Sequence, residues 1–245
     1  MLRAILVVIF LILFFIYSIP MFLIELLIGK INPRAKDMSS LRIVQWAFKV
    51  ILFLSGTSTT VIGYDRIPKD EPILFVGNHK SYFDVIISYA KMPNRTGFVA
   101  KKEIEKVPLL RVWMRYLYCL FLDRSNPREG LKTVIQGIDY MKQGISLVIF
   151  PEGTRNTHED GMLPFHEGSL KFAEKSASRI IPMVQNNTGE CWERHLPFIK
   201  RTHTVLEFCE PIDISTLSAE DKKHLGAYVQ NIIAEKYEEN KKYLL

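Results

Sequence analysis

The chain has little cysteine, and its cysteines follow no recognised pattern. Among 245 residues there are three, Cys119, Cys191 and Cys209, an odd number with no Cys-x-x-Cys spacing. This argues against a disulfide framework and a cysteine-ligated metal site, and it favours a reducing, cytosolic setting for the folded part. Low-complexity tracts and internal repeats are absent too. With 48% hydrophobic and 24% charged residues, the chain is neither disordered nor fibrous, and its length fits one domain or a compact domain with an appendage.

Acidic residues are scarce at the N-terminal end. The first 60 residues hold six basic side chains but only two acidic ones, Glu25 and Asp37, so they carry +4 of the chain's formal net charge of +6. Nucleic acid is not the expected partner, because this positive charge lies beside the most apolar part of the chain. Anionic lipid headgroups would meet it there.

An uncharged run of 21 residues, 4–24, is long enough to cross a bilayer. As an α-helix it would extend about 31 Å, and it is too long for a signal peptide and has no small-residue cleavage site after it. Residues 41–54 are apolar apart from a narrow polar stripe, which predicts an amphipathic helix in the membrane interface or, alternatively, a buried core helix. Pro20 is expected to interrupt the first helix, so a hairpin that dips into one leaflet is an alternative to a full span.

Basic residues follow the uncharged run and predict its orientation. Lys30, Arg34 and Lys36 place the rest of the protein on the cytoplasmic side of the cell membrane by the positive-inside rule. We therefore expect residues 1–60 to form a membrane anchor with an amphipathic helix, and residues 61–245 to form a separate α/β domain.

Beyond residue 60, short apolar runs alternate with longer helical patterns. Predicted strands cover residues 73–77, 97–100, 119–122, 146–150, 180–184 and 204–209. Predicted helices cover residues 81–89, 109–117, 127–142, 165–175 and 219–242. Alternation at this interval implies crossover connections, so the expected fold class is α/β, with a mixed, largely parallel sheet covered by helices.

Polar side chains gather just after four of the predicted strands, in residues 78–84, 101–103, 123–124 and 151–155. In sheets of this kind, binding sites form in the loops at the carboxyl ends of the strands. We therefore expect a histidine–aspartate pair, several cations and a carboxylate to converge at one edge of the sheet.

His79 and Asp84 lie on either side of a predicted strand-to-helix turn. If Ser81 is the N-cap, Asp84 is the third helical residue and its carboxylate can turn back towards His79. It would then hold one imidazole nitrogen and leave the other free as a general base. The alternative is purely structural, since Ser81-x-x-Asp84 is also a capping box ahead of an apolar run.

The turn Glu152-Gly153-Thr154-Arg155 follows a buried strand. Its backbone and its guanidinium can receive an oxyanion. Arg124, one step past another strand, and a lysine of the pair Lys101-Lys102 would add positive charge, which predicts a phosphate site. The alternative is that each cation pairs with a neighbouring carboxylate on a solvated surface.

Four motifs, in this order, resemble those of the glycerolipid acyltransferases. They are Asn78-His79-x4-Asp84, Phe121-Leu122-Asp123-Arg124, Phe150-Pro151-Glu152-Gly153-Thr154-Arg155 and Ile181-Pro182-Met183-Val184. The resemblance is closest to the bacterial members that acylate 1-acyl-sn-glycerol-3-phosphate, and it covers roughly residues 61–215. The apolar N-terminus is similar to the family's two-helix membrane-binding arrangement.

This resemblance implies a reaction and a role for each residue. His79 would remove the proton from the sn-2 hydroxyl of lysophosphatidic acid, which attacks an acyl thioester directly to give phosphatidic acid in phospholipid biosynthesis, and Asp84 would orient His79. Arg124 and Arg155 would hold the phosphate with one of the two lysines, while Glu152 would position the glycerol. The implied substrate-binding residues are Lys101, Lys102, Arg124, Glu152, Gly153, Thr154 and Arg155. No metal, cofactor or acyl-enzyme is implied, and the donor would be acyl-CoA or an acyl carrier protein thioester.

Other functions are compatible with the same residues. The acceptor could instead be glycerol-3-phosphate or another lysolipid. His79, Asp84 and Glu152 could be ligands of a metal-dependent phosphoesterase, although their spacing matches no common metal site. A lipid-binding protein without catalytic activity could also use this scaffold.

Overall fold

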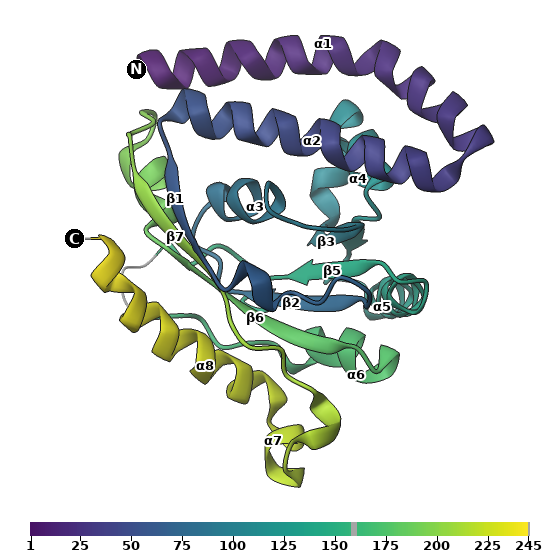
Figure 1. Ribbon diagram of the computed structural model, residues 1–245, viewed down its shortest axis with the longest axis vertical. Coiled ribbons are helices and arrows are strands. Elements are labelled where there is room, and N and C mark those ends of the chain that lie inside the picture. Colours follow the sequence, from purple (N-terminus) through teal and green to yellow (C-terminus); the bar gives the residue numbers. More distant parts are fainter. Residues whose placement is uncertain (158–160, 245) are drawn as a thin grey trace.

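The computed structural model describes residues 1–157 and 161–244, and at its centre is a seven-stranded sheet (Figure 1). The strands are β1 Ser58–Ile62, β2 Ile73–Gly77, β3 Thr96–Lys101, β4 Leu120–Leu122, β5 Ser146–Ile149, β6 Arg179–Asn186 and β7 His203–Phe208. Their order across the sheet is β1-β7-β6-β2-β5-β3-β4. Only β6 and β7 are antiparallel neighbours, which confirms the mixed, largely parallel sheet.

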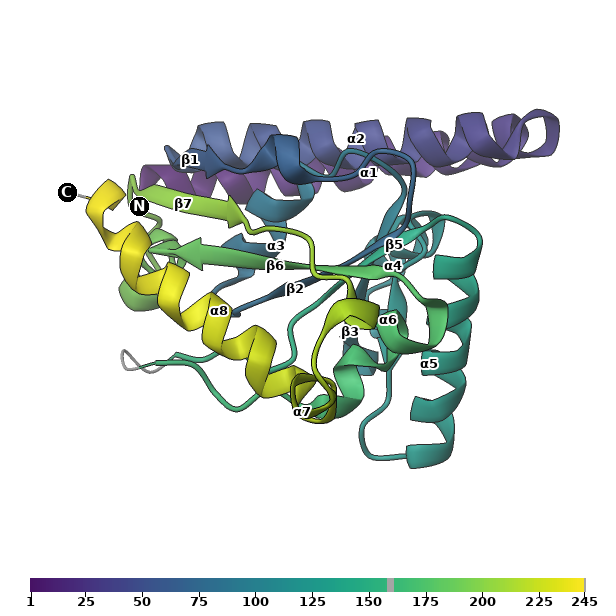
Figure 2. The ribbon, with the colours of Figure 1, turned by 60° about the horizontal axis from the view of Figure 1, so that its bottom comes forward.

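Helices cover both faces of the sheet. They are α1 Leu2–Ile31, α2 Pro33–Ser55, α3 Tyr82–Tyr89, α4 Pro108–Tyr116, α5 Pro127–Lys142, α6 Lys171–Ser176, α7 Ala219–Lys223 and α8 Leu225–Glu239. The first four lie on one side of the sheet, and α5, α6 and α8 lie on the other (Figures 1 and 2).

The two larger hydrophobic cores of the described residues lie on opposite faces of the sheet, and neighbouring residues of the central strand β2 contribute to different cores. Phe75 belongs to the same core as Phe83 of α3, whereas Val76 belongs to the other core, with Phe172 of α6 and Val229 of α8. Successive side chains of a strand point to opposite faces. Because both faces are covered, β2 is a continuous apolar run and not an alternating one.

Helices α1 and α2 run side by side and are joined at Asn32 (Figure 2). Asn32 Oδ1 accepts a hydrogen bond from the Ala35 backbone N–H at 3.0 Å, and Pro33 occupies the first turn of α2, where a missing N–H costs nothing. The expected interruption at Pro20 is wrong, because α1 runs unbroken through it. The helix gives up one hydrogen bond there, while packing against α2 and α4 holds the turns on either side. By length and composition, either helix could cross a membrane.

Helix α2 is also a core helix along one side. Leu41 and Val44 are buried in the core, and Gln45 Nε2 donates to two backbone carbonyls at and beyond the end of α3, at 3.1 and 2.7 Å. The other side of α2 exposes Trp46 and Phe53. Residues 41–54 therefore form a helix that is buried in the core on one side, as the second alternative predicted, and that exposes apolar side chains on the other side.

Three elements differ from their predictions. The sequence patterns miss β1, which lies at the edge of the sheet beside β7, because its first three residues, Ser-Thr-Thr, are not apolar. The helix predicted at 165–175 becomes α-helical only at Lys171, after a 3-10 turn that contains Gly168. The helix predicted at 219–242 is divided at His224 into α7 and α8, and this break lets α8 lie against β6.

Candidate active site

The turn between β2 and α3 is held from both ends. Asn78 is fully buried and forms two hydrogen bonds of 2.9 Å with the backbone of Gln185 in β6. Ser81 is the N-cap of α3, with its Oγ accepting from the Phe83 N–H at 2.9 Å. The backbone that carries His79 is thus anchored to the central sheet and to the helix.

His79 and Asp84 lie in direct contact within this turn. His79 Nδ1 is 2.8 Å from Asp84 Oδ2, and that oxygen also accepts from the backbone N–H groups of Lys80 and Ser81, each at 2.7 Å. The imidazole stacks on the ring of Phe150, with centroids 4.3 Å apart and planes 12° from parallel. Asp84 is fully buried, while the His79 side chain is 16% exposed. The capping box and the histidine–carboxylate pair therefore coexist on a single oxygen, and the geometry leaves Nε2 for other partners.

Glu152 connects two loops behind this pair. Its Oε1 accepts from the His79 N–H at 2.7 Å and its Oε2 from the Leu163 N–H at 2.9 Å. Burial raises the pKa of the Glu152 carboxyl, while the two backbone N–H groups oppose that shift. Both oxygens are engaged with the backbone, so this side chain fixes the position of His79.

Arg124 lies against the turn that follows β5. Its Nη1 donates to the Gly153 carbonyl. Gly153 has a positive φ of 71°, and a Cβ at this position would lie 2.1 Å from Arg124 Nη1. The positive φ favours glycine there, and a larger residue would also displace the end of the Arg124 side chain. Thr154 is the exposed residue of the same turn.

Arg155 is paired within the protein. Its guanidinium lies 3.8 Å from the centre of the Tyr82 ring, and its Nη1 is 3.3 Å from Glu193 Oε1. The side chain is 32% exposed, so part of the fork faces outward. The expected cation is present beside the His79 turn, but with two protein partners.

The two lysines behave differently from each other. Lys102 Nζ is 2.9 Å from Asp123 Oδ2 on the side of β4 and α5. For Lys102, the structure thus shows the pairing with a neighbouring surface carboxylate that was the alternative to a phosphate site. Lys101, at the exposed end of β3, makes no side-chain hydrogen bond or ion pair with the residues that the structure describes.

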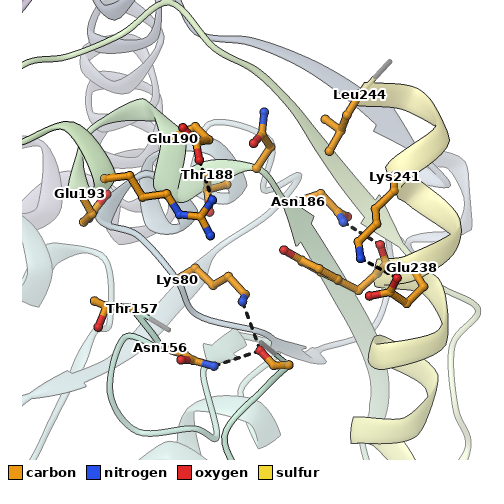
Figure 3. Close-up of a pocket in the computed structure, with 15 residues that line it drawn as sticks. Lys80, Asn156, Thr157, Asn186, Thr188, Glu190, Glu193, Glu238, Lys241 and Leu244 are labelled. Atoms are coloured by element: carbon orange, nitrogen blue, oxygen red, sulfur yellow. Dashed lines mark hydrogen bonds and ion pairs between the residues drawn. The ribbon is translucent and has the colours of Figure 1, made fainter. Parts of the chain in front are cut away.

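A polar cavity of about 600 Å³ lies beside the His79 turn, towards α8 (Figure 3). Lys80, Asn156 and Glu193 form its wall on the side of the turn, and the Asn156 N–H donates to the His79 carbonyl at 2.7 Å. Lys80 is buried, with Nζ donating to the Gly161 carbonyl at 3.1 Å. One residue of the cavity wall, Asn156, is thus hydrogen-bonded to the backbone of His79.

Sequence reasoning missed Tyr82 and Glu193 as partners of Arg155. Tyr82 is within the first motif, and an aromatic residue there was an available signal. Glu193 lies 38 residues after Arg155, in a 3-10 turn beyond β6, and no local pattern points to it.

The structure is that of an α/β protein. A histidine–aspartate pair and an arginine-bearing turn lie at the carboxyl ends of two adjacent parallel strands, β2 and β5. In α/β proteins of this class, ligands bind at that edge of the sheet. The family model for acyltransferases matches residues 58–186, and the chain belongs to this family.

Named relatives agree with this assignment. A 1-acyl-sn-glycerol-3-phosphate acyltransferase from Borreliella burgdorferi is 28% identical over 78% of this chain and 76% of its own length. One from Haemophilus influenzae is 30% identical over 71% and 73%, respectively. The fold is similar to the crystal structure of the 1-acyl-sn-glycerophosphate acyltransferase PlsC from Thermotoga maritima. That comparison gives a TM-score of 0.79 at 22% identity and covers 97% of this chain and 96% of the other.

Proposed function

We propose that this protein transfers an acyl group from a thioester to the sn-2 hydroxyl of lysophosphatidic acid. The observation that carries the proposal is the contact of 2.8 Å between His79 Nδ1 and Asp84 Oδ2 in a chain of the acyltransferase family. The names of the relatives, 1-acyl-sn-glycerol-3-phosphate acyltransferases, supply the acceptor.

In the proposed reaction, His79 acts as a general base. Its Nε2 takes the proton of the acceptor hydroxyl while the oxygen attacks the thioester carbonyl. The C–S bond then breaks, and the imidazolium returns the proton to the departing thiolate. Asp84 keeps Nδ1 protonated and stabilises the imidazolium. The attack is direct, so the proposed reaction has no acyl-enzyme intermediate and requires no metal or cofactor.

The phosphate of the acceptor would bind at the arginines. Arg155 lies on the turn after β5, and Arg124 lies against that turn. Guanidinium groups bind phosphate through paired N–H donors. Lys101 is the lysine best placed to assist, because Lys102 is engaged by Asp123. Glu152 would act through the backbone of His79. Binding energy at the phosphate would fix the hydroxyl against the base and so lower the entropic part of the barrier.

The helical pair would hold the protein on a membrane surface. The outer side of α1 exposes large apolar side chains along its length, whereas α2 is packed on α3 and could not cross a bilayer without losing those contacts. We therefore place the pair along one leaflet. Lys30 and Arg34, exposed at the turn between the helices, favour the cytoplasmic leaflet with its anionic lipids.

The test is transfer of a radiolabelled acyl group by the full chain in detergent micelles. Acyl-CoA and acyl carrier protein thioesters would be offered separately, with lysophosphatidic acid or glycerol-3-phosphate as acceptor. We expect phosphatidic acid from the wild type and a loss of about 10²–10⁴-fold in rate for His79→Ala. The variant His224→Ala, which removes an exposed histidine away from the site, is the matched control.

Each outcome of this experiment has a definite meaning. Preferred transfer to glycerol-3-phosphate would replace the proposed acceptor. Absence of transfer to either acceptor by a folded protein would refute the proposed reaction and favour a lipid-binding function. Full activity of His79→Ala would refute the assignment of the base.

A further inference from the structure

Glu193 contacts both the start of α3, next to the His79 turn, and the side chain of Arg155. Its Oε2 accepts from Ser81 Oγ at 2.6 Å and its Oε1 from the Tyr82 N–H at 2.8 Å, so it caps α3 next to the His79 turn. The same Oε1 is 3.3 Å from Arg155 Nη1. The carboxylate is only 10% exposed, which reduces the screening of its charge by water.

The arrangement of Arg155 depends on this carboxylate and on one ring. The guanidinium stacks on Tyr82, and the Tyr82 ring itself lies against Trp192, with centroids 5.8 Å apart. Among the residues that the structure describes, Glu193 contacts the Arg155 guanidinium at Nη1 alone, so the remaining N–H groups can bind a second anion. A long side chain held at one edge in this way loses less freedom when it binds a ligand.

We propose that Glu193 is a positioning residue that holds Arg155 ready for the phosphate of the lysolipid acceptor. The inference rests on the proposed function. Glu193 acts through Arg155 and does not touch the reacting atoms, so it affects acceptor binding more than the chemical step. Because it also caps α3, it links the place where the phosphate binds to the turn that carries the base.

The experiment separates this role from simple capping. KM for lysophosphatidic acid, KM for the acyl donor and kcat would be measured for Glu193→Ala, Arg155→Ala, the double variant and Glu193→Gln. We expect Glu193→Ala to raise KM for lysophosphatidic acid about tenfold, with kcat and the donor KM changed less than about threefold. Glu193→Gln should show a smaller increase, since its amide oxygen can still accept from Arg155 Nη1, although without the negative charge.

The double variant provides the decisive comparison. If Glu193 acts through Arg155, Glu193→Ala adds nothing to KM once Arg155 is alanine. Glu190→Ala is the matched control, because Glu190 lies in the neighbouring turn and pairs with Arg194 at 2.6 Å; it should leave KM unchanged. An equal rise in both KM values, or a full additional tenfold in the Arg155→Ala background, would overturn the inference.

A binding measurement keeps this inference distinct from the proposed reaction. Affinities for lysophosphatidic acid and for monoacylglycerol, which lacks the phosphate, would be compared in neutral detergent micelles. We expect the wild type to prefer lysophosphatidic acid and Glu193→Ala to lose most of that preference. This result would support the role of Glu193 even if the wild type transferred no acyl group. No preference in the wild type, or an unchanged preference in Glu193→Ala, would overturn it.

Discussion

At the scale of single residues, Asp84 combines a structural and a proposed chemical role in one oxygen. Its Oδ2 accepts from two backbone N–H groups of the α3 cap and from His79 Nδ1. The backbone donors fix the carboxylate, so the imidazole meets a partner that cannot rotate away. A cap and the proposed catalytic dyad are compatible here because both need an acceptor oxygen at the same point.

Asp84→Asn tests the chemical part of this double role. The amide oxygen can still accept from the Lys80 and Ser81 N–H groups, but it no longer stabilises an imidazolium. We expect kcat to fall by about 10²–10⁴-fold with little change in melting temperature, measured by acyl transfer and thermal unfolding. Asp213→Asn, which removes the capping carboxylate of an exposed 3-10 turn, should retain full activity. Activity of Asp84→Asn within threefold of wild type would reduce Asp84 to a cap.

The Asp123 carboxylate makes stability depend on acid pH. Hydrogen bonds from Ser125 and then from Lys102 lower its pKa from 3.8 to about 2. Because the native pKa lies below the unfolded value, the stabilisation is fully present above about pH 4 and is lost as the pH falls towards 2. Asp123→Asn should therefore be less stable than wild type at pH 7, with the difference vanishing near pH 2.

Urea unfolding of the two proteins across this pH range, in a neutral detergent, measures the effect. Lys102→Ala should also lose stability relative to wild type at pH 7, but less than Asp123→Asn does. The variant removes only Lys102, and Asp123 keeps its hydrogen bonds from Ser125. A difference in stability that stays constant from pH 7 to pH 2 would contradict the assigned pKa shift.

At the scale of elements, polar contacts lock the helical pair. Glu25 of α1 is fully buried and accepts from Ser39 Oγ at 2.6 Å and from Ser40 Oγ at 2.9 Å in α2. On the neighbouring side, Trp113 Nε1 of α4 donates to Ser18 Oγ of α1 at 2.8 Å. These bonds fix the rotation of α1, which apolar packing alone specifies weakly.

Glu25→Ala is expected to loosen the pair. Two serine hydroxyls would be left without their acceptor, at a cost of about 1–3 kcal/mol in the free energy of unfolding. Glu25→Gln, which keeps an oxygen acceptor and has a nearly identical volume, should lose less. Thermal unfolding in detergent micelles, with proteolysis in the turn near Asn32 as a second readout, compares the three proteins. A melting temperature for Glu25→Ala equal to that of wild type would show that the contact adds nothing.

At the scale of the whole molecule, α1 and α2 cover the α3 face of the α/β part as an outer layer (Figures 1 and 2). Their exposed side chains are largely apolar, including most of the outer side of α1. An apolar surface of this extent on a protein with basic residues at its margin is typical of a membrane-binding face.

Quenching of tryptophan fluorescence tests the proposed orientation. Trp46 on α2 is 51% exposed, whereas Trp113 is 2% exposed. If the helical pair lies along one leaflet, vesicles with brominated acyl chains should quench Trp46, and Trp46→Phe should lose most of the quenching. Anionic lipid should strengthen binding, and added salt should weaken it. Quenching unchanged by Trp46→Phe, or binding independent of lipid charge, would contradict this orientation.

Much of the architecture could be predicted because its signals are local. Helix α5 begins at Pro127 and ends at Lys142 as predicted, since Asn126 caps it and proline suits a first turn. The loops of the site were predicted because parallel strands direct their carboxyl ends to one edge. The edge strand β1 and the break at His224 were missed, because the first is half polar and the second depends on how α8 meets the sheet.

The sequence by itself determined the alternation of strands and helices, the apolar N-terminal segments, and the short-range contact of His79 with Asp84. These two residues are only five positions apart across a strand-to-helix turn, which restricts where their side chains can lie. Only the tertiary structure decided which cations remain near the pair. Lys102 turns to Asp123, and Arg155 meets Glu193. Such pairings join segments 21 and 38 residues apart, and their geometry depends on strand order and on the packing of whole elements, which no local pattern encodes.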